Sequence, residues 1–261
     1  MAYKPFDLTG KTALVTGGNG GIGLGFADAL AQAGASVAIW GTNAAKNDAA
    51  VKQLRAHGTR VEAWTIDVAD EAAVIKGITE GVQAFGAIHA IYANAGIGRG
   101  ARSFLDITTE DYRKVLSVNL DGVFFTLREG ARHMVERHKA GDRSGGSLVG
   151  VASLAAIHGA ARNQHYAATK GAVISMIRAT AVEMARYGIR ANAVLPGWIA
   201  IDMTAGGQAN PKFVENVISR VPMKRWGEPQ DFGGIAVYLA SDASSFHTGD
   251  SFLIDGAYAI Y

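Results

Sequence analysis

Residues Leu14–Gly23, with the sequence LVTGGNGGIG, indicate the fold, and the rest of the chain repeats their strand–turn–helix pattern. An apolar strand enters a Gly-rich turn, and apolar residues at helical spacing follow as far as Gly34. Gly17, Gly21 and Gly23 stand at the spacing G-x-x-x-G-x-G. Glycines at such points let the backbone approach a ligand closely and let the helix pack on the strand. The helix start then presents N–H groups and a positive dipole, which favour a pyrophosphate. The alternative is a tight strand-to-helix turn that binds nothing.

The composition excludes several classes of protein. With 261 residues, 49% of them hydrophobic, the chain is long enough to bury a large core. A net charge of +2 without a block of Lys or Arg argues against a nucleic-acid partner. The absence of cysteine excludes disulfides, thiol catalysis and Cys-ligated metal, and fits a reducing cytoplasm. No apolar run reaches the ~18 residues that span a bilayer, and the first seven residues have no apolar core, so we expect no signal sequence. We expect a cytoplasmic protein with no bound metal and no membrane partner.

Strand and helix patterns alternate along the whole sequence, with short connections. This rhythm predicts an α/β fold with about seven parallel strands and helices on both faces of the sheet. We expect one domain over residues 1–261, with a mobile substrate flap near 202–222. The expected strands are Thr12–Thr16, Ser36–Trp40, Arg60–Ile66, Ile88–Ala93, Ser147–Ser153, Ile189–Leu195 and Ser251–Ile254. The expected helices are Gly21–Ala33, Ala44–His57, Glu71–Phe85, Thr109–Arg137, His165–Tyr187 and Glu228–Ala240.

Polar or turn-forming residues follow most of these strands. The carboxyl ends of parallel strands form one edge, where open α/β sheets bind their ligands. Asp67-Val68 follows the third strand, and the Asp67 carboxylate could accept from a purine amino group. Asn94-Ala95-Gly96 follows the fourth strand, Ser153 ends the fifth and Pro196-Gly197 follows the sixth. We therefore expect these residues to meet at one rim.

Tyr166 and Lys170 are four residues apart and share one helix face. Such a pair is common by chance on a helix surface, but Ser153 lies thirteen residues earlier at a strand end. A nearby ammonium lowers the pKa of a phenol, which is otherwise near 10. With the Ser153 hydroxyl holding the substrate oxygen, the Tyr166 phenol can give a proton to an alkoxide or take one from an alcohol.

Taken together, these motifs resemble the short-chain dehydrogenase/reductase family over essentially the whole chain. The resemblance implies a Rossmann-like doubly wound sheet and hydride transfer between a nicotinamide and a ketone or secondary alcohol. It also implies a catalytic tetrad of Asn119, Ser153, Tyr166 and Lys170, in which Lys170 lowers the Tyr166 pKa and holds the nicotinamide ribose. Asn119 would interrupt its helix and hold a water that links Lys170 to solvent.

The resemblance extends to the residues that contact the ligands. The dinucleotide would contact Gly17, Asn19, Gly21, Ile22, Gly23, Gly41, Thr42, Asn43, Asp67, Val68, Asn94, Ala95, Gly96, Tyr166, Lys170, Pro196, Gly197, Ile199, Ile201 and Met203. The substrate would contact Ser153, Ala155, His158, Tyr166 and Trp198, with further contacts from Ile97–Phe104, Gln164-His165 and the flap.

Two positions depart from the family pattern. Many relatives carry a Thr that contacts the cofactor where this chain has Ile201, so Thr204 would have to replace it. NAD-selective members carry an acid where Gly41 stands, and NADP-selective members carry an Arg at Thr42 or nearby. Gly41 removes a repulsive charge and leaves space, while Thr42, Asn43 and Lys46 can bind a 2′-phosphate. The sequence thus favours NADP(H), with NAD(H) usable.

The expected partner is a small ketone or secondary alcohol. A 3-oxoacyl thioester reductase and a sugar or polyol dehydrogenase remain alternatives on the same site, as do a dehydratase or epimerase and a dinucleotide sensor without turnover. The resemblance also implies a homotetramer. Its interfaces would use apolar residues of the long helices and the apolar C-terminus, namely Val123, Phe124, Phe125, Met176, Ile177 and Phe252–Tyr261.

Overall fold

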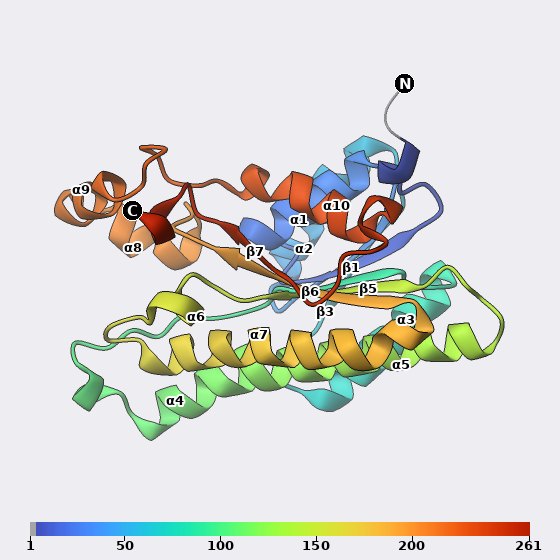
Figure 1. The fold of residues 1–261 in the computed structure, drawn as a ribbon, viewed down its shortest axis with the longest axis horizontal. Helices are drawn as coiled ribbons and strands as arrows, with labels where there is room; N and C mark the ends of the chain where they lie inside the picture. The colour runs from blue at the N-terminus through green and yellow to red at the C-terminus, as the bar shows by residue number, and fades with distance from the viewer. Residues whose placement is uncertain (1–3) are drawn as a thin grey trace.

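The fold is built on a seven-stranded parallel sheet with the strand order β3-β2-β1-β4-β5-β6-β7. The structure is a computed structural model and describes residues 4–261. Figure 1 shows the sheet between two layers of helices. The strands are β1 (Thr12–Thr16), β2 (Ser36–Gly41), β3 (Val61–Thr65), β4 (Ala90–Ala93), β5 (Gly146–Val151), β6 (Ile189–Pro196) and β7 (Ser251–Ile254). The predicted fold class is confirmed.

The central strands are buried on both faces because a helix layer covers each face. Ala13 and Val15 of β1 belong to one hydrophobic core, and Leu14 between them belongs to the other. The first layer contains α1 (Gly21–Gln32), α2 (Ala44–Leu54) and α10 (Gly233–Ala240), and the second contains α3 (Glu71–Phe85), α4 (Thr109–Leu116), α5 (Gly122–Lys139) and α7 (Gln164–Met184). This two-sided burial explains the nearly continuous apolar runs of the strands.

The strand order reverses between β1 and β4, which pair in register from Ala13↔Ala90 to Val15↔Tyr92. In open α/β sheets this reversal point leaves a crevice outside the carboxyl ends of the two strands. The Gly-rich turn leaves β1 here, and Asn94 leaves β4 beside it. The topology therefore places the first two predicted ligand segments next to each other.

The helix expected over Thr109–Arg137 is interrupted. The chain forms α4, then a π-helical turn over Ser117–Asp121, and then α5. Asn119 lies inside the π turn and is fully buried. The helix is therefore irregular at Asn119, as predicted. The apolar spacing of the sequence does not indicate the bounds of the π-helical turn.

The segment expected as a flap is largely helical. It contains a 3₁₀ turn over Asp202–Thr204, then α8 (Ala205–Gln208) and α9 (Pro211–Ser219). Figure 1 shows α8 and α9 beside the C-terminus, at one end of the molecule. The short helix α6 (Ala155–His158) follows β5. Among residues 4–261, no helix combines the length and the apolar character that crossing a membrane requires.

Candidate active site

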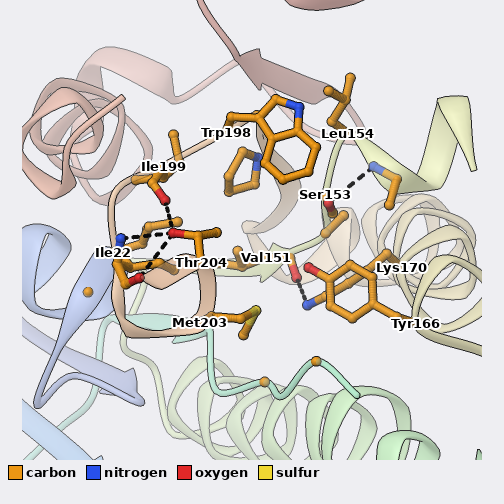
Figure 2. Close-up of a pocket in the computed structure, with 18 of the residues that line it drawn as sticks. Ile22, Val151, Ser153, Leu154, Tyr166, Lys170, Trp198, Ile199, Met203 and Thr204 are labelled. Atoms are coloured by element: carbon orange, nitrogen blue, oxygen red, sulfur yellow. Dashed lines mark hydrogen bonds between the residues drawn. The ribbon is translucent and has the colours of Figure 1, made fainter. Parts of the chain in front are cut away.

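A cavity of about 920 Å³ opens at the carboxyl edge of the sheet and runs from the Gly-rich turn to the segment after β5. Most of the predicted ligand contacts line it. These are Gly17, Asn19, Gly21, Ile22, Asn94, Ala95, Gly96, Ser153, Ala155, His158, Tyr166, Lys170, Pro196, Gly197, Trp198, Ile199, Ile201 and Met203. Figure 2 shows Ser153, Tyr166 and Lys170 together on one side, with Met203 and Thr204 across from them.

The Gly-rich turn has the geometry of a phosphate-binding turn. Gly17 and Gly21 adopt left-handed φ angles of +64° and +51°, which side chains other than glycine resist. A Cβ atom at Gly23 would lie 2.2 Å from the Gly17 carbonyl oxygen, so only glycine lets α1 start this close to β1. The start of α1 therefore faces the cavity with its N–H groups free of side-chain caps. These residues fit the pyrophosphate of a dinucleotide.

Asn94 fixes the two strand ends that flank this turn. Its Nδ2 donates to the Thr16 carbonyl oxygen at 2.9 Å. The Thr16 hydroxyl oxygen accepts from the backbone N–H groups of Asn94 and Ala95, at 3.0 and 2.9 Å. These hydrogen bonds satisfy polar groups of both segments. They join the end of β1 to the segment after β4, and the residues that follow each of these strands line the cavity.

Tyr166, Ser153 and Lys170 form the polar centre of the cavity. The Ser153 hydroxyl lies close enough to the Tyr166 phenol to lower its pKa, and its oxygen accepts from the Ala155 N–H at 3.1 Å. Lys170 is 3% exposed, and its Nζ donates to the Val151 carbonyl oxygen at 2.8 Å. The same Nζ lies 5.6 Å from the centre of the Tyr166 ring. The hydroxyl, phenol and ammonium thus meet as the sequence predicted.

Burial controls the protonation of these groups. It raises the pKa of Tyr166, and the hydrogen bond with Ser153 only partly opposes this shift. Burial also lowers the pKa of Lys170 to about 8. Lys170 is not among the groups that shift the Tyr166 pKa, so its predicted lowering effect is not seen, and the raised pKa keeps the phenol protonated at neutral pH. In this state Tyr166 is a proton donor.

Several predicted cofactor contacts do not line the cavity: Gly23, Gly41, Thr42, Asn43, Asp67 and Val68. Gly23 lies beneath the turn as described above. The Asp67 carboxylate accepts from the Ala69 N–H at 3.0 Å, within its own loop. His165, expected near the substrate, is buried in α7 and does not line the cavity.

The space expected at Gly41 is filled. A Cβ atom there would lie 2.1 Å from the Asn19 Nδ2 and 2.5 Å from the Asn47 Oδ1. These two side chains are hydrogen-bonded to each other at 2.7 Å, and Asn47 also donates to the Gly41 carbonyl oxygen. The interpretation of Gly41 as an open position is thus wrong, because an amide pair from the Gly-rich turn and α2 occupies it.

The chain has no free hydroxyl at the position of Ile201. The Ile201 side chain packs over Gly21, where an added Cβ would lie 3.2 Å from its Cγ2. The Thr204 hydroxyl lines the cavity but donates to the Ile199 carbonyl oxygen at 2.6 Å and accepts from Gln208 at 2.8 Å. Thr204 therefore stabilises the start of the flap instead of presenting a free donor.

Several further residues line the cavity, and only Lys46 among them was singled out from the sequence. Asn163, Arg220 and Tyr258 line the cavity, together with Lys46 and Asp202, whose side chains form an ion pair at 2.7 Å. Arg220 and Tyr258 reach the site only through tertiary packing, and no local motif marks them. Among residues 4–261, no cluster of three or more acidic or histidine side chains is placed to hold a metal ion.

Comparisons with known proteins agree with this geometry. A family model described as enoyl-(acyl carrier protein) reductase matches residues 17–259. The L-rhamnose 1-dehydrogenase (NAD(P)(+)) of Azotobacter vinelandii is 38% identical, covering 95% of this chain and 96% of the relative. The NADP-dependent (R)-specific alcohol dehydrogenase of Lentilactobacillus kefiri is 39% identical, covering 96% and 97%.

A solved structure shares the whole fold. The gluconate 5-dehydrogenase of Burkholderia cenocepacia, in complex with NADP and tartrate, is 34% identical with a TM-score of 0.92, and 98% of each chain is covered. The chain belongs to the short-chain dehydrogenase/reductase family. It is a nicotinamide-dependent oxidoreductase that acts on CH–OH groups, as predicted.

Proposed function

We propose that this enzyme interconverts a secondary alcohol and a ketone of sugar or polyol type, with Tyr166 as the group that exchanges the proton. The observation that carries this proposal is the contact of Tyr166 with Ser153, above the buried Lys170, in a cavity continuous with the Gly-rich turn. Ser153 would hold the substrate oxygen, and Tyr166 would transfer a proton to or from it.

The protonation states support the direction of each step. In reduction, the protonated phenol gives its proton to the oxygen of the carbonyl. The bound nicotinamide supplies the hydride to the carbonyl carbon. The Lys170 ammonium then lies close enough to stabilise the phenolate, because Nζ is 5.6 Å from the ring centre. Since the Lys170 pKa is about 8, this stabilisation weakens above that pH.

The dinucleotide would lie along the Gly-rich turn, with Asn19 and Ile22 beside it and Lys170 at the nicotinamide ribose. We propose NADP(H) as the preferred cofactor, with NAD(H) usable. No acid stands at the end of β2 to repel a 2′-phosphate. Lys46 lines the cavity near the N-terminus of α2, where it pairs with Asp202, and would exchange that ion pair for one with the phosphate. The relatives that use NADP or both cofactors support this assignment.

The sugar or polyol class is supported by the relatives named for rhamnose and gluconate and by the polar groups near Tyr166. Ser153, His158 and Asn163 all line this part of the cavity, together with the larger apolar surface of Trp198. The matching family model, described as an acyl carrier protein reductase, keeps a 3-oxoacyl thioester reductase as the second candidate.

A substrate panel tests the proposal directly. Absorbance at the reduced-nicotinamide band follows turnover of alditols, aldoses, aldonates, simple secondary alcohols and acetoacetyl-CoA with both cofactors. We expect kcat/KM to be highest for a polyhydroxylated substrate with NADP(H). Faster turnover of acetoacetyl-CoA than of every polyol would instead assign the thioester reaction.

We also propose that the chain acts as one domain with residues 202–222 as a flap, and forms a homotetramer in the cytoplasm. Two of the residues first suggested for the interface, Val123 and Ile177, are buried in the core and do not support it. Phe124 of α5 is 43% exposed and Val182 of α7 is 83% exposed, so these helices still present apolar surface. Light scattering at micromolar protein should give four times the chain mass.

A further inference from the structure

Arg220 brings an unpaired guanidinium to the mouth of the active-site cavity. The residue caps α9 at the end of the flap, is exposed, and lines the cavity that contains Tyr166. Within residues 4–261, no carboxylate lies at ion-pair distance from it. By contrast, Lys46 pairs with Asp202 at 2.7 Å and Arg225 pairs with Asp231 at 2.6 Å. The charge of Arg220 is therefore available to a ligand.

An aromatic ring from the C-terminus holds this guanidinium in place. The Arg220 Cζ lies 4.5 Å from the centre of the Tyr258 ring, which is within the range of a cation–π interaction. The Tyr258 ring in turn packs edge-on against Trp198, with centroids 6.4 Å apart. Figure 1 shows the C-terminal turn beside the flap helices. The contact between Arg220 and Tyr258 therefore joins the end of α9 to the C-terminal turn, two segments that are separated by α10 and β7 in the sequence.

The turn that carries Tyr258 is itself fixed. The two carboxylate oxygens of Asp255 accept from the N–H groups of Ala257 and Ala259, at 2.9 and 2.7 Å. Ala257 adopts a left-handed φ of +70°, an uncommon conformation for a residue with a side chain. Asp255 also packs on Gly197, where an added Cβ would lie 2.6 Å from the Asp255 Cβ. Arg220 is thus positioned relative to the Pro196-Gly197 turn, which lines the same cavity as Tyr166.

The other charges of the cavity are already used. Lys170 is buried and bonded to the Val151 carbonyl oxygen. Asp202, the one carboxylate among the described residues that line the cavity, accepts from Lys46. The substrate end of the cavity therefore carries an uncompensated positive charge at Arg220. A planar guanidinium binds a carboxylate through two parallel hydrogen bonds, which fixes orientation as well as affinity.

We propose that Arg220 binds a carboxylate of the substrate, so that the enzyme acts on a hydroxy acid or keto acid of sugar-acid type in preference to a neutral polyol. This inference rests on the proposed function and narrows its substrate class.

Matched substrates test the inference. We would measure kcat/KM with NADP⁺ for C4–C6 aldonates and for alditols matched carbon for carbon, in the wild type and in Arg220→Gln. The wild type should prefer an aldonate at least tenfold. Arg220→Gln should lower kcat/KM for that aldonate at least tenfold and for the alditol less than twofold, with partial recovery in Arg220→Lys. Lys212→Gln removes an exposed flap charge that does not line the cavity and should change neither value.

A binding measurement separates this inference from the proposed function. Calorimetry would record D-gluconate binding to the NADP⁺-loaded wild type and Arg220→Gln, while NADPH fluorescence records cofactor affinity. Gluconate binding that Arg220→Gln abolishes, with cofactor affinity unchanged, supports the carboxylate site even if no polyol is oxidised. Alditol oxidation without Arg220-dependent aldonate binding or preference would overturn the inference and leave the proposed function standing. An equal loss for acid and neutral substrates, or a loss of cofactor affinity alone, would also overturn it.

Discussion

Asn119 and Ile97 are joined by two hydrogen bonds of 2.8 Å. The Asn119 Oδ1 accepts from the Ile97 N–H, and its Nδ2 donates to the Ile97 carbonyl oxygen. The π-helical turn is thereby fastened to the segment after β4, and Gly96 lies between Asn119 and the Lys170 ammonium. Each end of the amide keeps one more hydrogen-bonding position, so these two bonds are compatible with the water expected from the family resemblance. The water-holding role of Asn119 stays a prediction.

Replacing Asn119 with Ala should therefore lower stability as well as activity. Two buried or half-buried backbone groups would lose their partners, which typically costs about 1–3 kcal/mol for each unsatisfied group. The Ile97 segment would then hold Gly96 and Lys170 less firmly. Urea unfolding and kcat, measured on the same preparation, check this expectation. Unchanged unfolding in Asn119→Ala would show that the two hydrogen bonds contribute little.

Tyr166→Phe removes the proposed proton donor and keeps the ring. Turnover should fall by ~10²–10⁴, the usual contribution of a positioned acid or base. Dinucleotide affinity, measured by fluorescence titration, should change little. Tyr112→Phe is a suitable control because Tyr112 is 40% exposed on α4 and does not line the cavity. A variant that keeps a tenth of the wild-type kcat would refute the assignment of Tyr166.

Ile201→Thr should improve cofactor binding. The side chain lies over Gly21 of the Gly-rich turn, so a hydroxyl at this position has access to a bound dinucleotide. One additional hydrogen bond is worth about 0.5–1.5 kcal/mol, which corresponds to a few-fold decrease in the dinucleotide Kd. Isothermal titration of the wild type and the variant provides the comparison. An unchanged or weaker Kd would mean that the flap places residue 201 away from the nicotinamide.

Cofactor preference is better tested at Thr42 than at Gly41. An acid at position 41 would collide with the Asn19–Asn47 amide pair, so its effect on cofactor choice would be mixed with distortion of the Gly-rich turn. Thr42 is exposed, and Thr42→Asp adds a negative charge where a 2′-phosphate would lie. We expect kcat/KM with NADP(H) to fall at least tenfold relative to NAD(H). A wild type that already prefers NADH tenfold would contradict the NADP(H) assignment.

The sequence predicts the fold well because its signals are local and agree with one another. Leu14 and Val15 enter a turn that only glycines can form, and polar residues end the neighbouring strands at the same edge. Ser153, Tyr166 and Lys170 were found for the same reason. The space above Gly41 and the packing of Tyr258 on Arg220 depend on side chains brought together from distant segments. Neither periodicity nor motif spacing contains that information. The raised pKa of Tyr166 also cannot be read from the sequence, since burial is a property of the assembled core.

Two histidines at the opposite edge of the sheet make the fold sensitive to acid. The His89 Nδ1 accepts from the Thr12 N–H at 3.0 Å, and the His133 Nε2 accepts from the Ile88 N–H at 3.1 Å. Both acceptors must be unprotonated. Burial, with the nearby Arg137 charge, lowers the pKa of both groups, and that of His89 falls to about 4. An unfolded histidine has a pKa near 6.5.

Between pH 6.5 and pH 4 the unfolded chain therefore binds more protons than the folded protein, so stability falls as the pH falls through this window. For His89 alone the loss at pH 5, relative to pH 7.5, is about 2 kcal/mol. His89→Asn keeps an acceptor at a similar position but does not titrate. Its unfolding free energy should fall by about 2 kcal/mol less than that of the wild type when the pH is lowered from 7.5 to 5. His158→Asn, which changes an exposed histidine, should behave like the wild type. If His89→Asn loses as much stability as the wild type over this range, His89 does not determine the acid sensitivity of the fold.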